Sequence, residues 1–300
     1  MDEREWLTDR FEEHRKRLRA VAYRMLGSLT EADDAVQDAW VRVSRAGAGE
    51  VENLGGWLTT VVSRVCLNML RSRNIRREES LGVHVPDPVV SSVSELDPEE
   101  EALLADSVGL ALLVVLDTLA PAERLAFVLH DMFELPFEEI APMVGRTPAA
   151  ARQLASRARR RVKGAEVPVP DPDLGRQREV VDAFFSAARG GEFDALVTLL
   201  DPDVVLRIDA GVTRPAASMV INGAAAVARQ AQIGLKSWFD RPVVHVQAAL
   251  VSGAAGVVVT IGGQPVTVMG FTVANGKIAE IDAIADPERA GRIVGGVLPG

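Results

Sequence analysis

A run of arginine side chains marks the segment from Phe137 to Lys163, which reads FEEIAPMVGRTPAAARQLASRARRRVK. From Ala141 to Lys163 it contains six arginines, one lysine and no acidic residue. Guanidinium groups bind phosphates and, with two parallel hydrogen bonds, the edges of bases. These residue types therefore predict binding of a nucleic acid.

The spacing of apolar residues around these cations predicts a helix, a tight turn and a second helix. Apolar residues recur at helical intervals over residues 137–144, and Gly145 then interrupts the pattern. Thr147 and Pro148 supply an N-cap hydroxyl and a proline at the first helical position. The second helix keeps a narrow apolar stripe, formed by Ala151, Leu154, Ala158 and Val162. A helix-turn-helix presents its second helix to the DNA major groove in this way. The alternative is a surface helix whose basic end suits the helix dipole.

An acidic surface is predicted on the helix that follows Thr30. Thr30 and Asp33 resemble a capping box, with aspartate in place of glutamate. Apolar residues at helical spacing predict a buried side, and the opposite side carries Asp33, Asp34, Gln37, Asp38 and Arg42. Without further context, such a face is either a solvated surface or a binding surface.

A third polar surface is predicted between Trp57 and Arg73. Its apolar residues recur at helical intervals, and its polar side carries Thr60, Arg64, Asn68, Arg71 and Arg73. Arginine, asparagine and an aromatic ring on one surface suit melted DNA, because bases stack on rings and phosphates pair with guanidinium groups. Trp57 taken alone also fits a core anchor, and Cys66 fits the core.

Composition limits the classes of protein to consider. The formal net charge is −9, but acidic residues concentrate between Arg76 and Asp106, so the local basic patches matter more for DNA than the total. One cysteine and four scattered histidines predict neither a disulfide framework nor a structural metal site. No apolar run is long enough to span a membrane, and the charged N-terminus with no apolar segment behind it predicts a cytoplasmic protein. We expect no cofactor.

The same composition predicts three modules joined by two connecting segments. We expect a helical domain at residues 1–75, an acidic linker at 76–106, and the helix-turn-helix domain at 107–164. A proline-rich connector at 165–175 then leads to an α+β domain at 176–300. The acidic linker is rich in proline and carboxylates, so we expect much of it to be mobile.

The chain up to Lys163 resembles the extracytoplasmic-function sigma factors, which contain only sigma domains 2 and 4. The resemblance is carried by EADDAVQDAWVR (Glu31–Arg42), GWLTTVVSRVCLNMLRSR (Gly56–Arg73), LxPAERLAFVLHDMF (Leu119–Phe133) and SRARRRV (Ser156–Val162). It implies a transcription initiation factor whose partners are core RNA polymerase, through the β′ clamp helices and the β flap, and promoter DNA.

The resemblance also implies roles for individual residues. Binding of core polymerase would fall to Asp33, Asp34, Gln37 and Asp38. The melted minus-ten element would be handled by Trp57, Arg64, Asn68, Arg71 and Arg73. The minus-thirty-five element would be read by Thr147, Arg152, Gln153, Ser156, Arg157 and Arg160.

The remaining residues predict an α+β domain with a curled sheet. Helical patterns at 178–189 and 193–200 precede strand patterns, and Asn275-Gly276 predicts a tight hairpin. The segment VVDAFFSAARGGEFDALVTLLDPDVVL resembles the SnoaL-like family, which implies a conical barrel with an internal pocket. Candidate pocket residues are Asp209, Arg214, Asn222, Trp238, His245 and Asp282.

We interpret the chain as an alternative sigma factor whose C-terminal domain modulates its activity in cis by docking on the sigma domains, with a small molecule as a candidate ligand. We assign it no catalytic residues. One alternative is a small-molecule isomerase or cyclase with a DNA-binding appendage. Another is a ligand-sensing one-component regulator, which would read DNA half-sites as a dimer.

Overall fold

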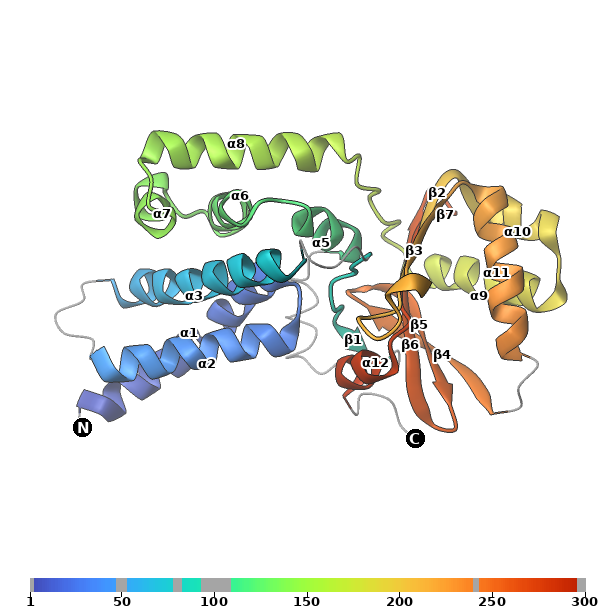
Figure 1. Cartoon of the computed structure of the whole chain (residues 1–300), viewed down its shortest axis with the longest axis horizontal. Coiled ribbons are helices and arrows are strands. Elements are labelled where there is room, and N and C mark those ends of the chain that lie inside the picture. The colour runs from blue at the N-terminus through green and yellow to red at the C-terminus, as the bar shows by residue number, and fades with distance from the viewer. Residues whose placement is uncertain (1–2, 47–52, 78–82, 93–108, 240–242, 296–300) are drawn as a thin grey trace. The chain divides into compact units, whose positions relative to one another are not determined.

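The computed structural model describes residues 3–46, 53–77, 83–92, 109–239 and 243–295 (Figure 1). It divides the chain into two compact units. Unit 1 contains Met1–Ser80 and Leu112–Glu166, and unit 2 contains Leu81–Ala111 and Val167–Gly300. Both of the predicted sigma domains thus belong to one unit.

Unit 1 is helical throughout its described residues. Its elements are α1 (Glu3–Leu26), α2 (Leu29–Ala46), α3 (Leu54–Arg77), α6 (Pro121–Phe127), the π-helical η1 (Val128–Met132), α7 (Phe137–Val144) and α8 (Pro148–Gly164). Helix α5 (Leu110–Asp117) begins in unit 2 and continues in unit 1. The predicted apolar stripes are buried, including Phe11, Leu18, Met25 and Val36. Cys66 is also buried, as its place in an apolar pattern predicts.

A buried arginine joins the two groups of helices in unit 1. Arg124 of α6 is 1% exposed; its Nε donates to the backbone oxygen of Arg24 in α1 at 3.2 Å. Its Nη1 lies 3.0 Å from Asp117, which also lies 3.9 Å from Arg73 of α3. The Arg24 guanidinium in turn lies over the Phe133 ring, 4.8 Å from its centroid. These contacts hold the predicted sigma domain 4 helices against those of domain 2.

The helix-turn-helix has the local structure that the sequence predicts. Helix α7 ends at Gly145, whose φ of 67° is the left-handed conformation that glycine adopts without strain. Helix α8 begins after Thr147, whose hydroxyl accepts from the amide of Ala150 at 3.3 Å. The apolar stripe of α8 differs slightly from the prediction, because Ala155 is buried with Ala151 and Ala158, whereas Leu154 and Val162 are half-buried.

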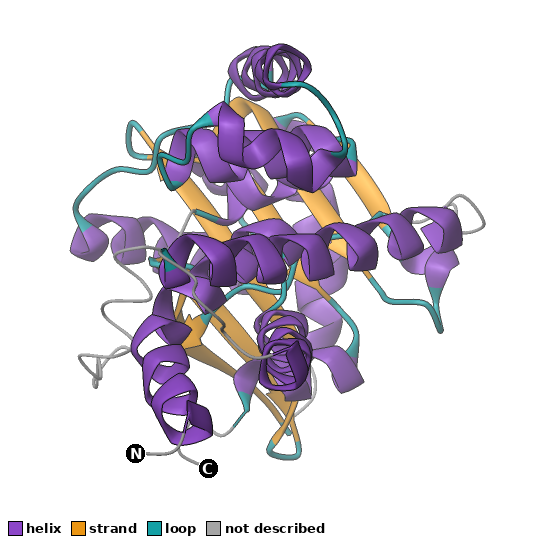
Figure 2. Ribbon diagram, turned by 90° about the vertical axis from the view of Figure 1, so that its left-hand side faces the viewer, coloured by secondary structure: helices purple, strands orange, loops and turns teal. Residues whose placement is uncertain are grey.

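Unit 2 is built around one seven-stranded sheet (Figure 2). Its strands are β1 (Val90–Ser91), β2 (Leu200–Asp209), β3 (Met219–Asn222), β4 (Val244–Val251), β5 (Ala254–Ile261), β6 (Gln264–Ala274) and β7 (Lys277–Ile284), in the order β1-β4-β5-β6-β7-β2-β3. Its helices are α9 (Leu174–Gly190), α10 (Phe193–Leu199), the short 3₁₀ helix η2 (Pro215–Ala217), α11 (Ala224–Phe239) and α12 (Pro287–Val294).

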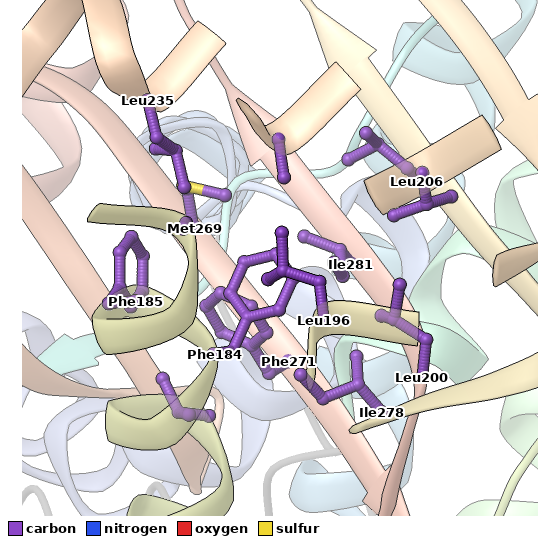
Figure 3. Close-up of a cluster of buried hydrophobic side chains, with 14 of the residues drawn as sticks. Phe184, Phe185, Leu196, Leu200, Leu206, Leu235, Met269, Phe271, Ile278 and Ile281 are labelled. Carbon is purple, nitrogen blue, oxygen red and sulfur yellow. The ribbon is translucent and has the colours of Figure 1, made fainter. Parts of the chain in front are cut away.

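Hydrophobic side chains fill the space between the sheet and helices α9, α10 and α11. Phe184 and Phe185 of α9 contact Phe271 of β6 edge to face, with ring centroids 6.0 and 5.9 Å apart (Figure 3). Leu196 of α10 and Ile281 of β7 belong to the same buried cluster. Residues of the opposite sheet face, with Val85, Val90 and Leu110, form a second buried cluster that includes α12.

The predicted antiparallel meander is present from β4 to β7, and Asn275 and Gly276 both have positive φ, as a tight hairpin requires. Strand β2 instead pairs with β7 in parallel. Strands β1 and β3 and helix α12 have no counterpart among the elements expected from the sequence. Two-residue and four-residue strands are too short to show a period, which explains the first two.

Candidate functional site

The acidic residues predicted on α2 lie together on its exposed face. The exposed side chains are Asp33, Asp34, Gln37 and Asp38. The alanine and valine side chains on the opposite side of α2 are buried. Arginines of the same unit pair with two of them: Arg19 Nε lies 2.6 Å from Asp33, and Arg42 Nη2 lies 2.7 Å from Asp38. The face is therefore open to a partner, and Asp34 and Gln37 lie at its centre.

Three of the predicted minus-ten residues share one exposed side of α3. Arg64, Asn68 and Arg71 are exposed and recur at helical intervals, and Trp57 at the start of the helix is half-buried. Arg73 differs from the prediction, because it points into unit 1. Its guanidinium donates to the backbone oxygen of Leu26 at 2.9 Å and also pairs with Glu31. In this arrangement Arg73 holds helices together and does not offer a free cation to DNA.

The predicted reading residues of α8 are all on its surface. Thr147 caps the helix, and the exposed side chains are Arg152, Gln153, Ser156, Arg157 and Arg160. Two other arginines of α8 form ion pairs with its own scaffold: Arg159 with Asp131 at 2.6 Å and Arg161 with Glu123 at 2.9 Å. The arginines that pair with the scaffold are thus separate residues from those predicted to contact DNA.

A cleft of about 520 Å³ lies beside the start of α3. One wall is formed by His14, Arg17 and the segment Asn53–Gly56, and the other by Phe133–Pro136 with Glu139. The segment before Trp57, which the resemblance assigns to the minus-ten element, therefore faces the scaffold of the helix-turn-helix.

The five candidate pocket residues whose side chains the structure describes do not surround one internal space. Asp209 and Asp282 alternate with strand residues whose side chains fill the hydrophobic interior, so they lie on the opposite face of the sheet. His245 on β4 and Asn222 on β3 are exposed. Four strands lie between β4 and β3 in the sheet, so these two side chains are far apart. Arg214 donates to the backbone oxygen of Ala285 at 2.5 Å. The side chain of Trp238 lies outside the described residues. The alternation of side chains along β2 and β7 explains why Asp209 and Asp282 lie away from the hydrophobic interior.

Asp282 belongs to a buried group of three charges. Arg207 Nη1 lies 3.1 Å from Asp282, and Arg207 Nη2 lies 3.2 Å from Glu280. Burial raises the pKa of Asp282 to about 6; Arg207 opposes that shift, and Glu280 adds to it. One arginine between two carboxylates leaves this group short of positive charge.

A second charged group holds residues of the acidic linker on unit 2. Asp209 Oδ2 accepts from the Val85 amide at 2.9 Å and pairs with Arg289 Nη1 at 2.6 Å. Arg289 Nε reaches Asp87 at 2.5 Å, and its Nη2 donates to the backbone oxygen of Val85. His84 Nδ1 lies 3.4 Å from Asp209. We call this group, formed by His84, Val85, Asp87, Asp209 and Arg289, the linker clamp.

The electrostatics of the linker clamp favour its charged form. Burial alone would raise the pKa of Asp209, but hydrogen bonds from His84, Val85 and Gly211 and the charge of Arg289 hold that pKa well below its usual range. Burial likewise opposes the charge of Arg289, yet Asp87 and Asp209 raise its pKa. The Asp209 carboxylate and the Arg289 guanidinium therefore stay ionised at neutral pH.

Backbone pairing extends the hold on the linker. Val90 and Ser91 pair with Val251 and Leu250 as an antiparallel edge strand, and the Ser252 amide donates to the backbone oxygen of Val89 at 2.7 Å. Val85 is fully buried. The sequence predicts an acidic linker at 76–106, much of it mobile, but residues 83–92 are a part of unit 2. Residues 78–82 and 93–106 of that segment lie outside the described residues. The sequence signal that could have suggested this is the apolar alternation of Val83, Val85 and Val89 around two prolines.

The proline-rich connector is fixed on the same unit. Asp171 accepts hydrogen bonds from the amides of Asn275 and Gly276 at 2.9 and 2.8 Å, and its own amide donates to Val273 at 2.8 Å. Leu110 lies in the buried cluster with Val85. Unit 2 thus holds the chain on both sides of residues 112–166.

Within the described residues, no helix is long and apolar enough to cross a membrane. The same residues include no group of three or more histidine, cysteine or carboxylate side chains that could hold a metal ion.

Comparisons with known proteins cover both units. The family models Sigma-70 region 2 and Sigma-70, region 4 match residues 10–75 and 109–162. The ECF RNA polymerase sigma factor SigJ of Mycobacterium tuberculosis is 38% identical over 289 residues, which cover 93% of this chain and 91% of that protein. A probable ECF RNA polymerase sigma factor of the same species, SigI, is 35% identical and covers 91% of each chain. The crystal structure of SigJ matches with a TM-score of 0.71 at 35% identity, over 94% of this chain and 97% of that one.

Proposed function

Because the chain belongs to the extracytoplasmic-function RNA polymerase sigma factors, we propose that it initiates transcription with its charged helix faces and that unit 2 restrains it through the linker clamp. It is an alternative sigma factor, a subunit that binds core RNA polymerase and directs initiation at particular promoters. The identity to SigJ over nearly the whole length of both chains carries this conclusion. Its place of action would be the cytoplasm, where core polymerase works.

We assign the polymerase and the promoter to different surfaces of unit 1. The acidic face of α2, with Asp34 and Gln37 at its centre, would bind the β′ clamp helices. The exposed side of α3 would contact melted minus-ten DNA through Arg64, Asn68 and Arg71. Arg73 is the residue that we move out of this set, because it is engaged inside the unit.

Helix α8 would read the minus-thirty-five element. Its cap at Thr147 and its exposed arginines match the way a recognition helix enters the major groove. The module that contains α8 would also contact the β flap.

We infer that unit 2 restrains the distance between the two helical modules, because it anchors the chain segment that connects them. With residues 83–92 held, the chain leaves unit 2 near Val85 in one direction and at Leu110 in the other, and both residues lie in one buried cluster. Release of the clamp adds about 30 residues to the connection, which reach up to about 100 Å when extended. The two promoter elements lie about 25 base pairs apart, or about 85 Å along the duplex. Once the Arg124 contacts within unit 1 open, the clamp would therefore limit the reach between the two proposed DNA-reading modules.

We propose a regulatory and non-catalytic role for unit 2. Phe184, Phe185 and Phe271 occupy the space between helices and sheet (Figure 3), and the polar candidates for a pocket are dispersed. A small molecule that modulates the protein would then act on the clamp rather than on an internal substrate pocket.

Run-off transcription with core polymerase and pooled bacterial promoter fragments tests the sigma factor assignment. We expect transcripts from a subset of fragments, lost when either promoter element of a responsive fragment is scrambled. The chain ended after Lys163 provides a second test, because it keeps all three charged faces. Silence of both proteins on every fragment would falsify the assignment.

A further inference from the structure

Arg152 of α8 lies over an aromatic ring of the preceding helix, and that ring also contacts a histidine. The guanidinium of Arg152 lies over the Phe137 ring, 5.2 Å from its centroid. The imidazole of His130 lies on the same ring, with centroids 3.9 Å apart, and His130 Nδ1 is 3.0 Å from the Leu135 backbone oxygen. Phe137 begins α7 and is 7% exposed, so its orientation is fixed by packing.

This contact distinguishes Arg152 from the other cations of α8. Arg159 and Arg161 are held by carboxylates. Among the described residues, Arg152 is the cation of α8 that lies over an aromatic ring. It also remains exposed, so the stack does not remove it from a partner.

Contact with a fixed ring reduces the conformational entropy that an exposed arginine side chain loses when it binds a base. A free arginine samples many rotamers, and a bidentate contact with a base selects one of them. A guanidinium that already lies over a ring has fewer orientations to lose, so less conformational entropy is lost when it binds a base.

We propose that Phe137 is a positioning residue for promoter recognition, which sets the guanidinium of Arg152 for a base in the minus-thirty-five element. The inference rests on the proposed role of α8 as the reading helix. It assigns specificity to a buried residue of the preceding helix, which makes no contact with DNA itself.

The alternative is that Phe137 only fills the core. Phe137→Leu keeps an apolar side chain at this position but removes the π face. Phe127→Leu provides a matched control, since Phe127 is also a nearly buried phenylalanine of the same module. Thermal unfolding of each variant measures the loss of packing separately from recognition.

The experiment measures the base preference of the holoenzyme on a responsive promoter randomised at the minus-thirty-five element. We expect Arg152→Ala to relax preference at one position. We expect Phe137→Leu to reduce preference at that same position by about two- to fivefold, the range of an exposed cation–π contact. In the Arg152→Ala background, Phe137→Leu should change the preference no further, and Phe127→Leu should leave the position unchanged in either background.

Two results overturn the inference in distinguishable ways. In the first, Arg152→Ala relaxes the base preference at one position, but Phe137→Leu weakens the preference at all positions equally, or its effect persists in the Arg152→Ala background. Phe137 is then a packing residue, and the role of α8 stands. If Arg152→Ala leaves every preference intact while transcription still depends on the element, Arg152 does not read a base and Phe137 has nothing to position.

Discussion

Asp282 ties the stability of unit 2 to pH. Burial raises its pKa from the usual value to about 6, so the folded protein holds a proton that the unfolded chain releases near pH 4. The folded state then binds more protons between these values, and the unfolding free energy falls as pH rises from about 4 to about 6. The loss is on the order of 2–3 kcal/mol and is complete above the folded pKa.

We therefore expect Asp282→Asn to flatten the pH dependence of stability. Urea unfolding of the full chain at several pH values from 4.5 to 7.5 should show a smaller fall in the unfolding free energy than the wild type. Asp182→Asn, on the exposed side of α9, serves as the control and should keep the wild-type fall. If the unfolding free energy of Asp282→Asn falls with pH as steeply as that of the wild type, the Asp282 carboxyl does not titrate in this window. The low pKa of Asp209 does not interfere, because its contribution is lost only as pH falls below about 4.

Cys66 gives a second residue-scale prediction. Burial raises the pKa of its thiol to about 12, and the thiolate is the reactive form. We expect an aromatic disulfide reagent at pH 8 to label the native protein only as fast as the domain of α1 to α3 opens. Labelling that is complete within seconds, without unfolding, would place Cys66 at the surface.

The exposed face of α2 is the surface that we propose for binding core polymerase. Asp34→Ala combined with Gln37→Ala should weaken capture of core polymerase by roughly tenfold, with a shallower dependence on salt, because an acidic contact surface is lost. The unfolding free energy should change by about 0.5 kcal/mol or less, since both side chains are exposed. Titration of labelled protein with core polymerase measures the affinity, and Asp182→Ala is the control. Normal capture by the double variant would remove α2 from the interface.

Strand β1 and α12 are the elements that close the linker clamp. Arg289→Ala leaves the carboxylates of Asp87 and Asp209 without their shared cation, so local opening should become easier by about 3 kcal/mol. Amide exchange at Val85 and Ser252 should then accelerate by roughly a hundredfold. Arg292→Ala removes an exposed arginine of the same helix and should change neither amide. Equal protection in Arg289→Ala would mean that backbone pairing alone holds the segment.

Local patterns predicted most elements because their signals are local. The helix stripes, the glycine that ends α7, the cap at Thr147 and the turn at Asn275-Gly276 each depend on residues within one or two turns of each other. The face on which Asp209 points depends on strand register, and the inward turn of Arg73 depends on Leu26 and Glu31 in another helix. No local pattern reports such partners.

For the whole molecule, composition was misleading about the linker. Prolines and carboxylates predict a free segment. Val85 nevertheless forms a hydrogen bond with Asp209, which is 124 residues away in the sequence, and Asp87 forms one with Arg289, which is 202 residues away. The clamp joins a segment between the two predicted sigma domains to helix α12. We propose that this contact lets unit 2 limit how far the two predicted DNA-reading modules can separate.

The most direct test of this account is run-off transcription by Arg289→Ala and Arg292→Ala on a responsive promoter, at equal amounts of holoenzyme. The account predicts more transcript from Arg289→Ala than from the wild type, because the freed linker lengthens the reach, and wild-type output from Arg292→Ala. Output from Arg289→Ala at or below the wild-type level, in protein whose Val85 amide exchanges rapidly, would contradict the restraint by unit 2.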